Sequence, residues 1–262
     1  MIPVSFQNFA NKSDYHRPVD IKKLKFIYFT TIRKSLEISK KITDLNILEV
    51  GCGKGNILLP LAYLGSNIVG FDIGSDSISE TNRKIKLNNY INVNAFEDNA
   101  YTFDLKTKFD LIIVSEVFEH LKSPEILIRQ LLSHSHSKTT ILVTIPNGFG
   151  PWEYKQSLLE PFRAIKRNNI IRNFFGKKKY EVIEGVAHVQ FYSLLEFVNL
   201  FDKSNLFCRN IYKSDSLLSF FLHDYPPSRT LGDFLTTKDI TLADRLPYWL
   251  ASGWYFNFEM KK

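Results

Sequence analysis

The run Ile-Leu-Glu-Val-Gly-Cys-Gly-Lys-Gly at residues 47–55 constrains the fold more than any other part of this sequence. Its first four residues suit a buried strand, three glycines follow at once, and a helical pattern begins at Asn56. Glycines have no Cβ, so a ligand can lie directly on the backbone, and the first amides of the new helix offer donors at the positive end of its dipole. We therefore predict a parallel strand that turns on glycines into a helix, with a ligand at the turn.

The spacing of the glycines and one acidic residue indicate which ligand this is. A dinucleotide-binding turn would read Gly-x-Gly-x-x-Gly, whereas here the glycines alternate and Glu49 stands inside the strand. The pattern resembles motif I of the class I S-adenosylmethionine (SAM) methyltransferases, E-x-G-x-G-x-G. The resemblance implies that Glu49 positions the methionine part of SAM. It also implies that the turn beneath the ligand consists of Gly51, Cys52, Gly53 and Gly55.

Further residues complete the predicted cofactor site. Asp72 closes the second strand, where a carboxylate can accept both ribose hydroxyls or cap the following turn, and Ile73 comes next. The resemblance implies an adenine contact after the third strand, and this role stays open between Asp98, Asn99 and no contact at all, because Asn can also accept a hydrogen bond. Ser115 ends a segment, Phe109-Asp-Leu-Ile-Ile-Val-Ser-Glu, that resembles motif IV of the family.

Strand and helix patterns alternate along most of the chain, which favours a parallel sheet. The expected strands of this part are about 45–50, 67–72, 91–96, 109–115 and 139–145. We expect an α/β, Rossmann-like fold: a seven-stranded, mostly parallel sheet with helices on both faces and an antiparallel addition near the C-terminus. We expect one methyltransferase domain over residues 1–262. Its predicted additions are a helical N-terminal extension at 1–44, irregular to residue 19, a basic lid-type insertion at 146–187, and a second insertion at 215–250 before the last strand.

A cluster of metal-binding residue types follows the fourth strand. Glu116, Glu119 and His120 can converge if the chain turns helically, and His188 can join them from a distant loop. Carboxylates and imidazoles suit a divalent cation such as Mg²⁺, Mn²⁺ or Zn²⁺. This E-x-x-E-H…H arrangement resembles the metal-dependent O-methyltransferases of the ubiquinone pathway and of small-RNA 3′ ends. The alternatives are a purely structural turn, or a metal-free site in which His120 or His188 is the general base.

Charge and composition limit the partners without identifying one. The formal charge is +7, and residues 162–180 hold seven Lys or Arg and no acidic residue, so the lid suits an anionic substrate, a membrane surface, or only solvent. Two cysteines, no secretory signal and no apolar run of membrane-spanning length favour a cytoplasmic location, with peripheral membrane contact as an option.

The chain resembles the ubiquinone-pathway O-methyltransferases and the methyltransferase type 11 and 23 group. The resemblance implies O-methylation of a hydroxyl on a small molecule, a sugar or a lipid-linked glycan. The alternatives are a metal-dependent RNA 2′-O-methyltransferase, against which the sequence contains no recognisable RNA-binding module, and a non-catalytic SAM-fold binding protein.

Overall fold

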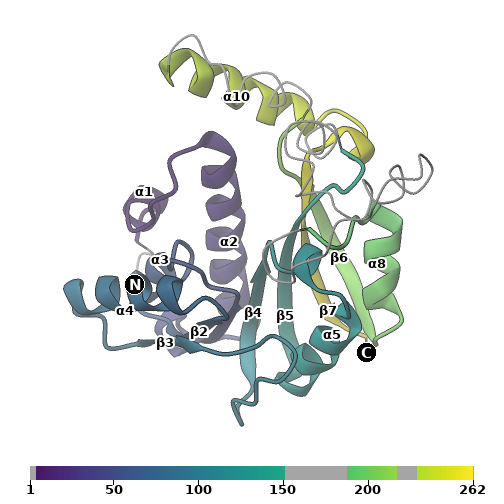
Figure 1. The fold of residues 1–262 in the computed structure, drawn as a ribbon. Coiled ribbons are helices and arrows are strands. Elements are labelled where there is room, and N and C mark those ends of the chain that lie inside the picture. The colour runs from purple at the N-terminus through teal and green to yellow at the C-terminus, as the bar shows by residue number, and fades with distance from the viewer. Residues whose placement is uncertain (1–3, 151–187, 217–228, 262) are drawn as a thin grey trace, which may run out of the picture.

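The structure is a computed structural model that describes residues 4–150, 188–216 and 229–261. Within them a single sheet has the strand order β3-β2-β1-β4-β5-β7-β6 (Figure 1). The strands are β1 (Asn46–Val50), β2 (Asn67–Asp72), β3 (Val93–Glu97), β4 (Phe109–Ser115), β5 (Ser135–Pro146), β6 (Leu206–Lys213) and β7 (Gly253–Met260). The first five strands, β1 to β5, pair with one another in parallel, whereas β7 runs antiparallel to both of its neighbours, β5 and β6. The predicted seven-stranded, Rossmann-like α/β sheet is thereby confirmed.

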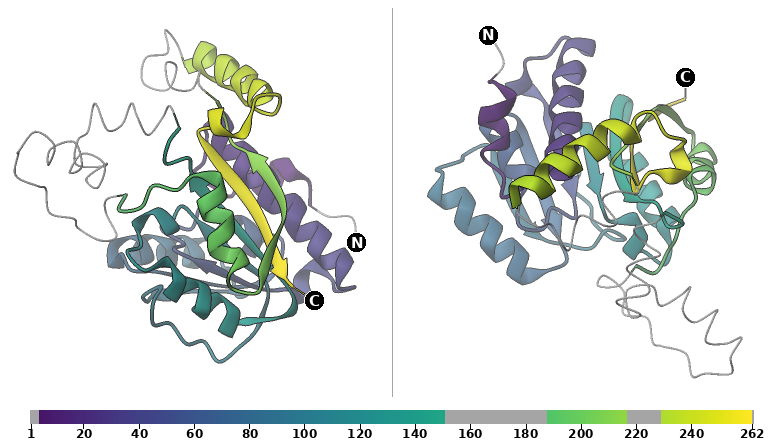
Figure 2. Two further views of the ribbon diagram at one scale, coloured as in Figure 1. Left: turned by 90° about the vertical axis from the view of Figure 1, so that its right-hand side faces the viewer. Right: turned by 90° about the horizontal axis from the view of Figure 1, so that it is seen from above.

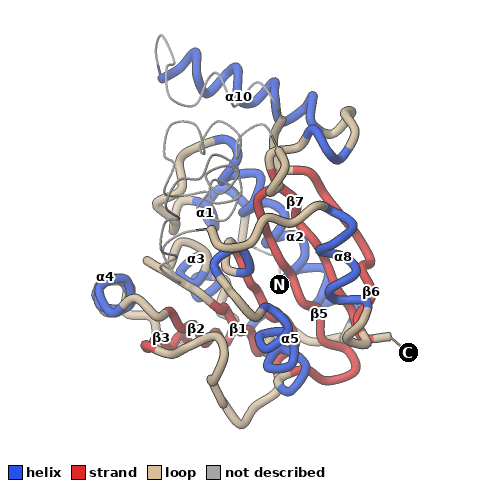
Figure 3. Tube along the Cα trace, turned by 45° about the vertical axis from the view of Figure 1, so that its right-hand side comes forward, coloured by secondary structure: helices blue, strands red, loops and turns tan. Residues whose placement is uncertain are grey.

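Helices cover both faces of the sheet, as Figures 1 and 3 show. One face packs against α2 (Pro18–Glu37), α3 (Leu58–Tyr63) and α4 (Ser75–Leu87), and the other against α5 (Pro124–Ser133) and α8 (Leu194–Asp202). The central strands are apolar on both sides because alternate side chains enter opposite layers. In β4, for example, Leu111 and Ile113 belong to one core, whereas Ile112 and Val114 belong to the other.

The strand order reverses between β1 and β4, and this reversal positions the site. Strands β2 and β3 lie in succession on one side of β1, whereas β4 and then β5 lie on the other side. Loops that leave neighbouring parallel strands at such a switch point diverge, so a crevice forms at the carboxyl edge. The glycine turn after β1 and the loop after β4 border this crevice together. A Cβ on Gly51 would lie 2.5 Å from Cγ2 of Val117.

Three predicted boundaries differ from the structure. The segment expected to be irregular contains α1 (Phe6–Ala10), which the Ser5 side chain caps. Strand β5 begins at Ser135 and not at Thr139, because Ser135 pairs with Phe109 across an irregularity in the ladder. Strand β3 begins at Val93, since the expected first residue, Ile91, is 99% exposed.

The two insertions are described only in part. The basic stretch 162–180 and most of the predicted lid lie outside the described residues. The second insertion contributes α10 (Arg229–Ala243), which lies against α2 before the chain enters β7 (Figure 2). Among the helices that the structure describes, none combines the length and the apolar character needed to span a bilayer.

Candidate cofactor and catalytic site

The glycine turn after β1 is fixed to β2 and leaves room above its centre. The backbone N–H groups of Gly51 and Cys52 both donate to the carbonyl oxygen of Phe71, at 2.8 and 2.9 Å. Gly53 has φ +49°, and a Cβ there would meet no atom within 4 Å. The backbone of Gly53 therefore faces open space, which is what a ligand lying on the chain requires.

Asp72 connects the ends of β1 and β2. One carboxylate oxygen, Oδ2, accepts from the Gly53 amide at 2.9 Å, and the other, Oδ1, accepts from the Gly74 amide at 2.8 Å. The turn-capping role and a ligand-binding role are compatible, because a carboxylate has about four acceptor positions and the two amides fill only part of them. Asp72 also lines the main pocket of this edge.

Glu49 is a carboxylate buried beneath the same turn. The residue is only 2% exposed, and among the described residues its Oε2 atom has no hydrogen-bond partner. Burial, reinforced by the negative charge of Asp72, raises the pKa of Glu49 well above its usual range, against a smaller opposing effect of the Leu58 amide. A buried acceptor without a donor is costly, so this position suits a ligand that brings a cationic hydrogen-bond donor.

A pocket of about 460 Å³ opens at this edge of the sheet. Five of the predicted cofactor residues line it: Gly51, Asp72, Ile73, Asp98 and Asn99. A Cβ on Gly55 would instead lie 3.1 Å from Cγ2 of Thr81, and Cys52 is buried, which raises the pKa of its thiol. The Ser115 hydroxyl lies 2.8 Å from that of Thr144 and is not part of the lining. The predicted residues thus divide into a pocket wall and a supporting layer.

The two candidates for the adenine contact are both partly occupied by their own loop. Asp98 Oδ1 accepts from the Asn99 amide at 2.7 Å, and Asn99 Oδ1 accepts from the Tyr101 amide at 2.9 Å. Asn99 therefore shapes the turn with its only side-chain acceptor. Asp98 also has a second carboxylate oxygen, which makes it the better acceptor for an exocyclic amine.

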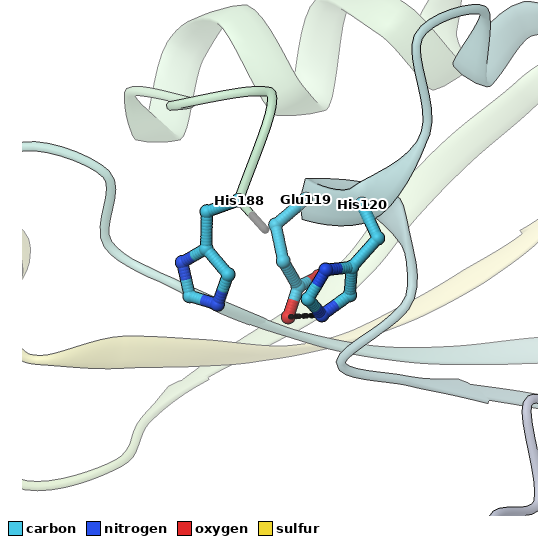
Figure 4. Close-up of side chains that lie close together, drawn as sticks. All are labelled: Glu119, His120 and His188. Carbon is cyan, nitrogen blue, oxygen red and sulfur yellow. Dashed lines mark ion pairs between the residues drawn. The ribbon is translucent and has the colours of Figure 1, made fainter. Parts of the chain in front are cut away.

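Three of the four predicted metal ligands meet at one point. Ligand atoms of Glu119, His120 and His188 all lie within 4.8 Å of one another, and the ring centroids of the two histidines are 5.0 Å apart (Figure 4). Glu119 and His120 sit in the 3-10 turn η2 (Phe118–His120). The His188 loop is anchored there because the Glu119 carbonyl accepts from the amides of Val189 and Gln190.

Glu116 departs from the predicted four-residue site. Its φ of +56° turns the chain sharply just before η2, so Glu116 does not share the face of Glu119 and His120. Its Oε1 accepts from Lys23 Nζ at 3.1 Å and from Thr144 Oγ1 at 2.8 Å. Desolvation opposes ionisation here, but the Lys23 charge and these hydrogen bonds outweigh it and lower the pKa of Glu116. Glu116 is therefore an ionised partner of Lys23 in this structure, and the cluster holds three ligands.

Lys23 and Thr144 are site residues that sequence reasoning missed. Lys23 comes from α2, far from any motif, yet its side chain is only 10% exposed. One signal was available: Lys23 stands four positions before Ile27, on the stripe of α2 that faces the sheet. A lysine on a buried stripe indicates an acidic partner across the interface.

Comparison with known proteins assigns this chain to a family. The family model of the methyltransferase domain matches residues 25–209. A ubiquinone biosynthesis O-methyltransferase of Rickettsia conorii is 33% identical over 98 residues, which are 37% of this chain and 34% of that protein. The chain thus spans only about a third of the length of this curated relative.

Solved structures agree with the fold. An O-methyltransferase from a polyketide multienzyme of Brevibacillus brevis, in complex with S-adenosyl-L-homocysteine, is 16% identical with a TM-score of 0.51, covering 88% of this chain and 72% of that one. The magnesium protoporphyrin IX methyltransferase of Synechocystis, with bound SAM, is 11% identical with a TM-score of 0.54, covering 95% and 87%. Together with the family match across most of the chain, the motif I turn and the strand order identify this protein as a member of the methyltransferase domain family.

Proposed function

We propose that this protein is a SAM-dependent methyltransferase that methylates a hydroxyl group on a small molecule, a sugar or a lipid-linked glycan. The observation that carries the proposal is the pairing of Glu49, buried with an unpartnered oxygen, and Asp72, held by two amides at the same strand edge. One carboxylate suits a cationic amino group and the other suits ribose hydroxyls. Both groups belong to SAM, and the backbone of Gly53 leaves open space between them.

SAM supplies an electrophilic methyl group, and the protein has to orient a hydroxyl toward it and remove the hydroxyl proton. His120 lines the cofactor pocket and lies next to His188, so either imidazole can take that proton. Glu119, within 3.9 Å of His120, can hold the imidazole and stabilise it once it is protonated.

The same cluster can bind a divalent ion in place of this acid–base role. Two imidazoles and a carboxylate leave coordination positions open, so an ion held by Glu119, His120 and His188 would lower the pKa of a bound hydroxyl and orient it. Turnover that disappears in EDTA and returns with Mn²⁺, Mg²⁺ or Zn²⁺ would support the ion. Full turnover in EDTA would leave His120 or His188 as the general base.

SAM binding is the first test. Titration calorimetry should give saturable binding of SAM, and a mass-spectrometric screen of sugars, phenols and RNA should give a product heavier by one methylene unit. A protein that binds SAM yet methylates nothing would favour the non-catalytic reading. Methylation of RNA alone would favour the 2′-O-methyltransferase reading, and contact of residues 162–180 with an anionic substrate or membrane remains part of the proposal.

A further inference from the structure

A second, smaller pocket adjoins the cofactor pocket and shares Glu116 with it. It encloses about 140 Å³ where the beginning of α2 meets the end of β5 and the beginning of β7. Glu116 lines both pockets, so a group bound in the second one lies across a single side chain from the cofactor pocket. The charged and aromatic groups around the second pocket are Arg17, Asp20, Lys23, Glu116, Asp215 and Tyr255.

The charges in this pocket are held in defined positions by one another. Arg17 binds Asp20 through two hydrogen bonds of 2.6 and 2.8 Å, and Lys23 binds Glu116 at 3.1 Å. Asp20 is 6% exposed and Lys23 is 8% exposed. Fixed pairs of this kind present donors and acceptors side by side, with little mobility to lose when a ligand binds.

Glu116 stands at the junction of the pockets in a conformation that few residues adopt. Its φ is +56°, and three hydrogen bonds retain it there: its amide donates to the Thr144 carbonyl at 3.0 Å, and its carboxylate accepts from Thr144 and Lys23. Backbone strain of this kind persists only where the surroundings enforce it, and it is concentrated at binding sites. The conformation is what directs the carboxylate between the two pockets.

We propose that this second pocket is the acceptor site and that it takes an uncharged, hydroxyl-rich group the size of one sugar ring; the inference rests on the proposed function. The volume is well below the roughly 300–1,000 Å³ of pockets for drug-sized ligands, so only one small ring or chain end fits. Neighbouring donors and acceptors match vicinal hydroxyls, each of which donates and accepts.

The lining argues against the other acceptor classes. Two cations stand against the three carboxylates of Asp20, Glu116 and Asp215, so the pocket does not share the positive charge of the whole chain and does not favour a phosphate. Its apolar lining, from Val19, Ile145, Pro146 and the Tyr255 ring, can cover one face of a sugar ring, and a volume of about 140 Å³ leaves no room for the tail of an apolar phenol. In the reaction, a sugar oxygen bonds to the methyl carbon while the carbon–sulfur bond breaks and its electron pair stays on sulfur. The hydroxyl proton leaves to His120, which lines the cofactor pocket together with Glu116.

The test measures acceptor and cofactor binding separately. The protein saturated with S-adenosyl-L-homocysteine is titrated with methyl glucoside, methyl mannoside and methyl rhamnoside, and in parallel with catechol and a short RNA, by saturation-transfer NMR and calorimetry. At least one glycoside should bind. Lys23→Met and the isosteric Asp20→Asn should each weaken glycoside binding about tenfold, as expected for the loss of one charge-assisted hydrogen bond. Asp20→Asn should change the affinity for S-adenosyl-L-homocysteine by less than about twofold, since Asp20 binds Arg17 and neither residue lines the cofactor pocket. Lys23→Met should change it less than it changes glycoside affinity, because Lys23 reaches the cofactor pocket only through Glu116.

Lys25→Met is the matched control, because Lys25 lies on the same helix but lines a different groove and contacts Phe6. It should leave glycoside binding unchanged. Binding of catechol or RNA but no glycoside would overturn the acceptor assignment while the proposed function stands. Thermal denaturation should show that the Asp20 and Lys23 variants are folded. If a glycoside binds these variants as tightly as it binds the wild-type protein, the acceptor site lies elsewhere. Failure of wild-type protein to bind SAM would overturn the proposed function, and the acceptor role would fall with it.

Discussion

The two halves of the sheet, which meet between β1 and β4, build their parts of the site in different ways. On the β1–β2 side the pocket wall comes from turns that directly follow consecutive strands, and Asp72 contacts Gly53 through one hydrogen bond across the strand ends. On the β4–β5–β7 side the polar groups come from distant parts of the chain. Lys23 of α2 meets Glu116 after β4, and His188 meets His120 across a long insertion.

The first half of the site is formed by residues close together in the sequence, whereas the second half is assembled from residues far apart in the sequence. Cofactor groups bind where a strand-turn-helix unit places amides and glycines by its own geometry, so a short motif suffices. Acceptor and catalytic groups have to converge around a reacting atom, and only the packing of several elements brings them together. If this comparison holds, substitutions on the β1–β2 side should change cofactor affinity, and those on the other side should change turnover.

The largest expected effect is on turnover, from His120→Gln. Loss of the imidazole should lower kcat about 10²–10⁴-fold, whether His120 is a base or a metal ligand. Because His120 also lines the cofactor pocket, SAM affinity should fall as well, but by no more than about tenfold. His136→Gln is the matched control, since His136 contacts Asp110 and lies outside the site. Steady-state kinetics and calorimetry check both. A fall in SAM affinity as large as the fall in kcat would break the division between the two halves.

Gly53→Asn should have the largest effect on cofactor binding. Asparagine tolerates the positive φ of Gly53, so the fold should persist, but its side chain would enter the open space above the turn. We expect SAM affinity to fall about 100-fold or more, because the ligand would lose its contact with the backbone. Gly65→Asn, at another positive φ beside Thr43, should leave the affinity unchanged. Normal SAM binding by folded Gly53→Asn would refute the assignment of the turn.

Glu49→Gln should weaken SAM binding and stabilise the free protein at neutral pH. The pKa of Glu49 is raised in the folded state, so its contribution to stability is fully present below about pH 4.5 and is lost as pH rises through the folded pKa. Glutamine carries no charge and avoids that loss. We expect about tenfold weaker binding of SAM and a thermal midpoint that exceeds the wild-type value increasingly from pH 5 to 8. A variant less stable than wild type at every pH would contradict this account of Glu49.

The smallest effect should distinguish the two adenine candidates. Asp98→Ala should weaken SAM binding several-fold, since its second oxygen is available to a ligand, and should also lower the thermal midpoint, since its Oδ1 accepts from the Asn99 amide. Asn99→Ala should lower the thermal midpoint more than the affinity, because it removes the acceptor for the Tyr101 amide. Calorimetry and thermal denaturation of both variants decide the matter. The reverse pattern would assign the adenine contact to Asn99.

Much of the fold follows from local patterns in the sequence. The bounds of β2 and β4 match the prediction because each is an apolar run whose end is set by the residues that follow. The glycine turn and the seven-stranded sheet follow for the same reason: their determinants are neighbours along the chain. The pairing of Ser135 with Phe109, which lengthens β5, could not be predicted from the local sequence, because it depends on a residue of β4.

By itself the sequence predicted the residues of the proposed cofactor side, since Glu49, Gly53 and Asp72 lie within one strand-turn-helix unit and its neighbour. Only the tertiary structure brought together the residues of the proposed acceptor side. The sequence predicted Glu116 as a ligand beside His120, but the positive φ of Glu116 directs its side chain away from the histidines, and its carboxylate binds Lys23. The physical reason is that a short motif encodes the direction of its own backbone, whereas the partner of a buried charge is whichever residue another packed element brings to it.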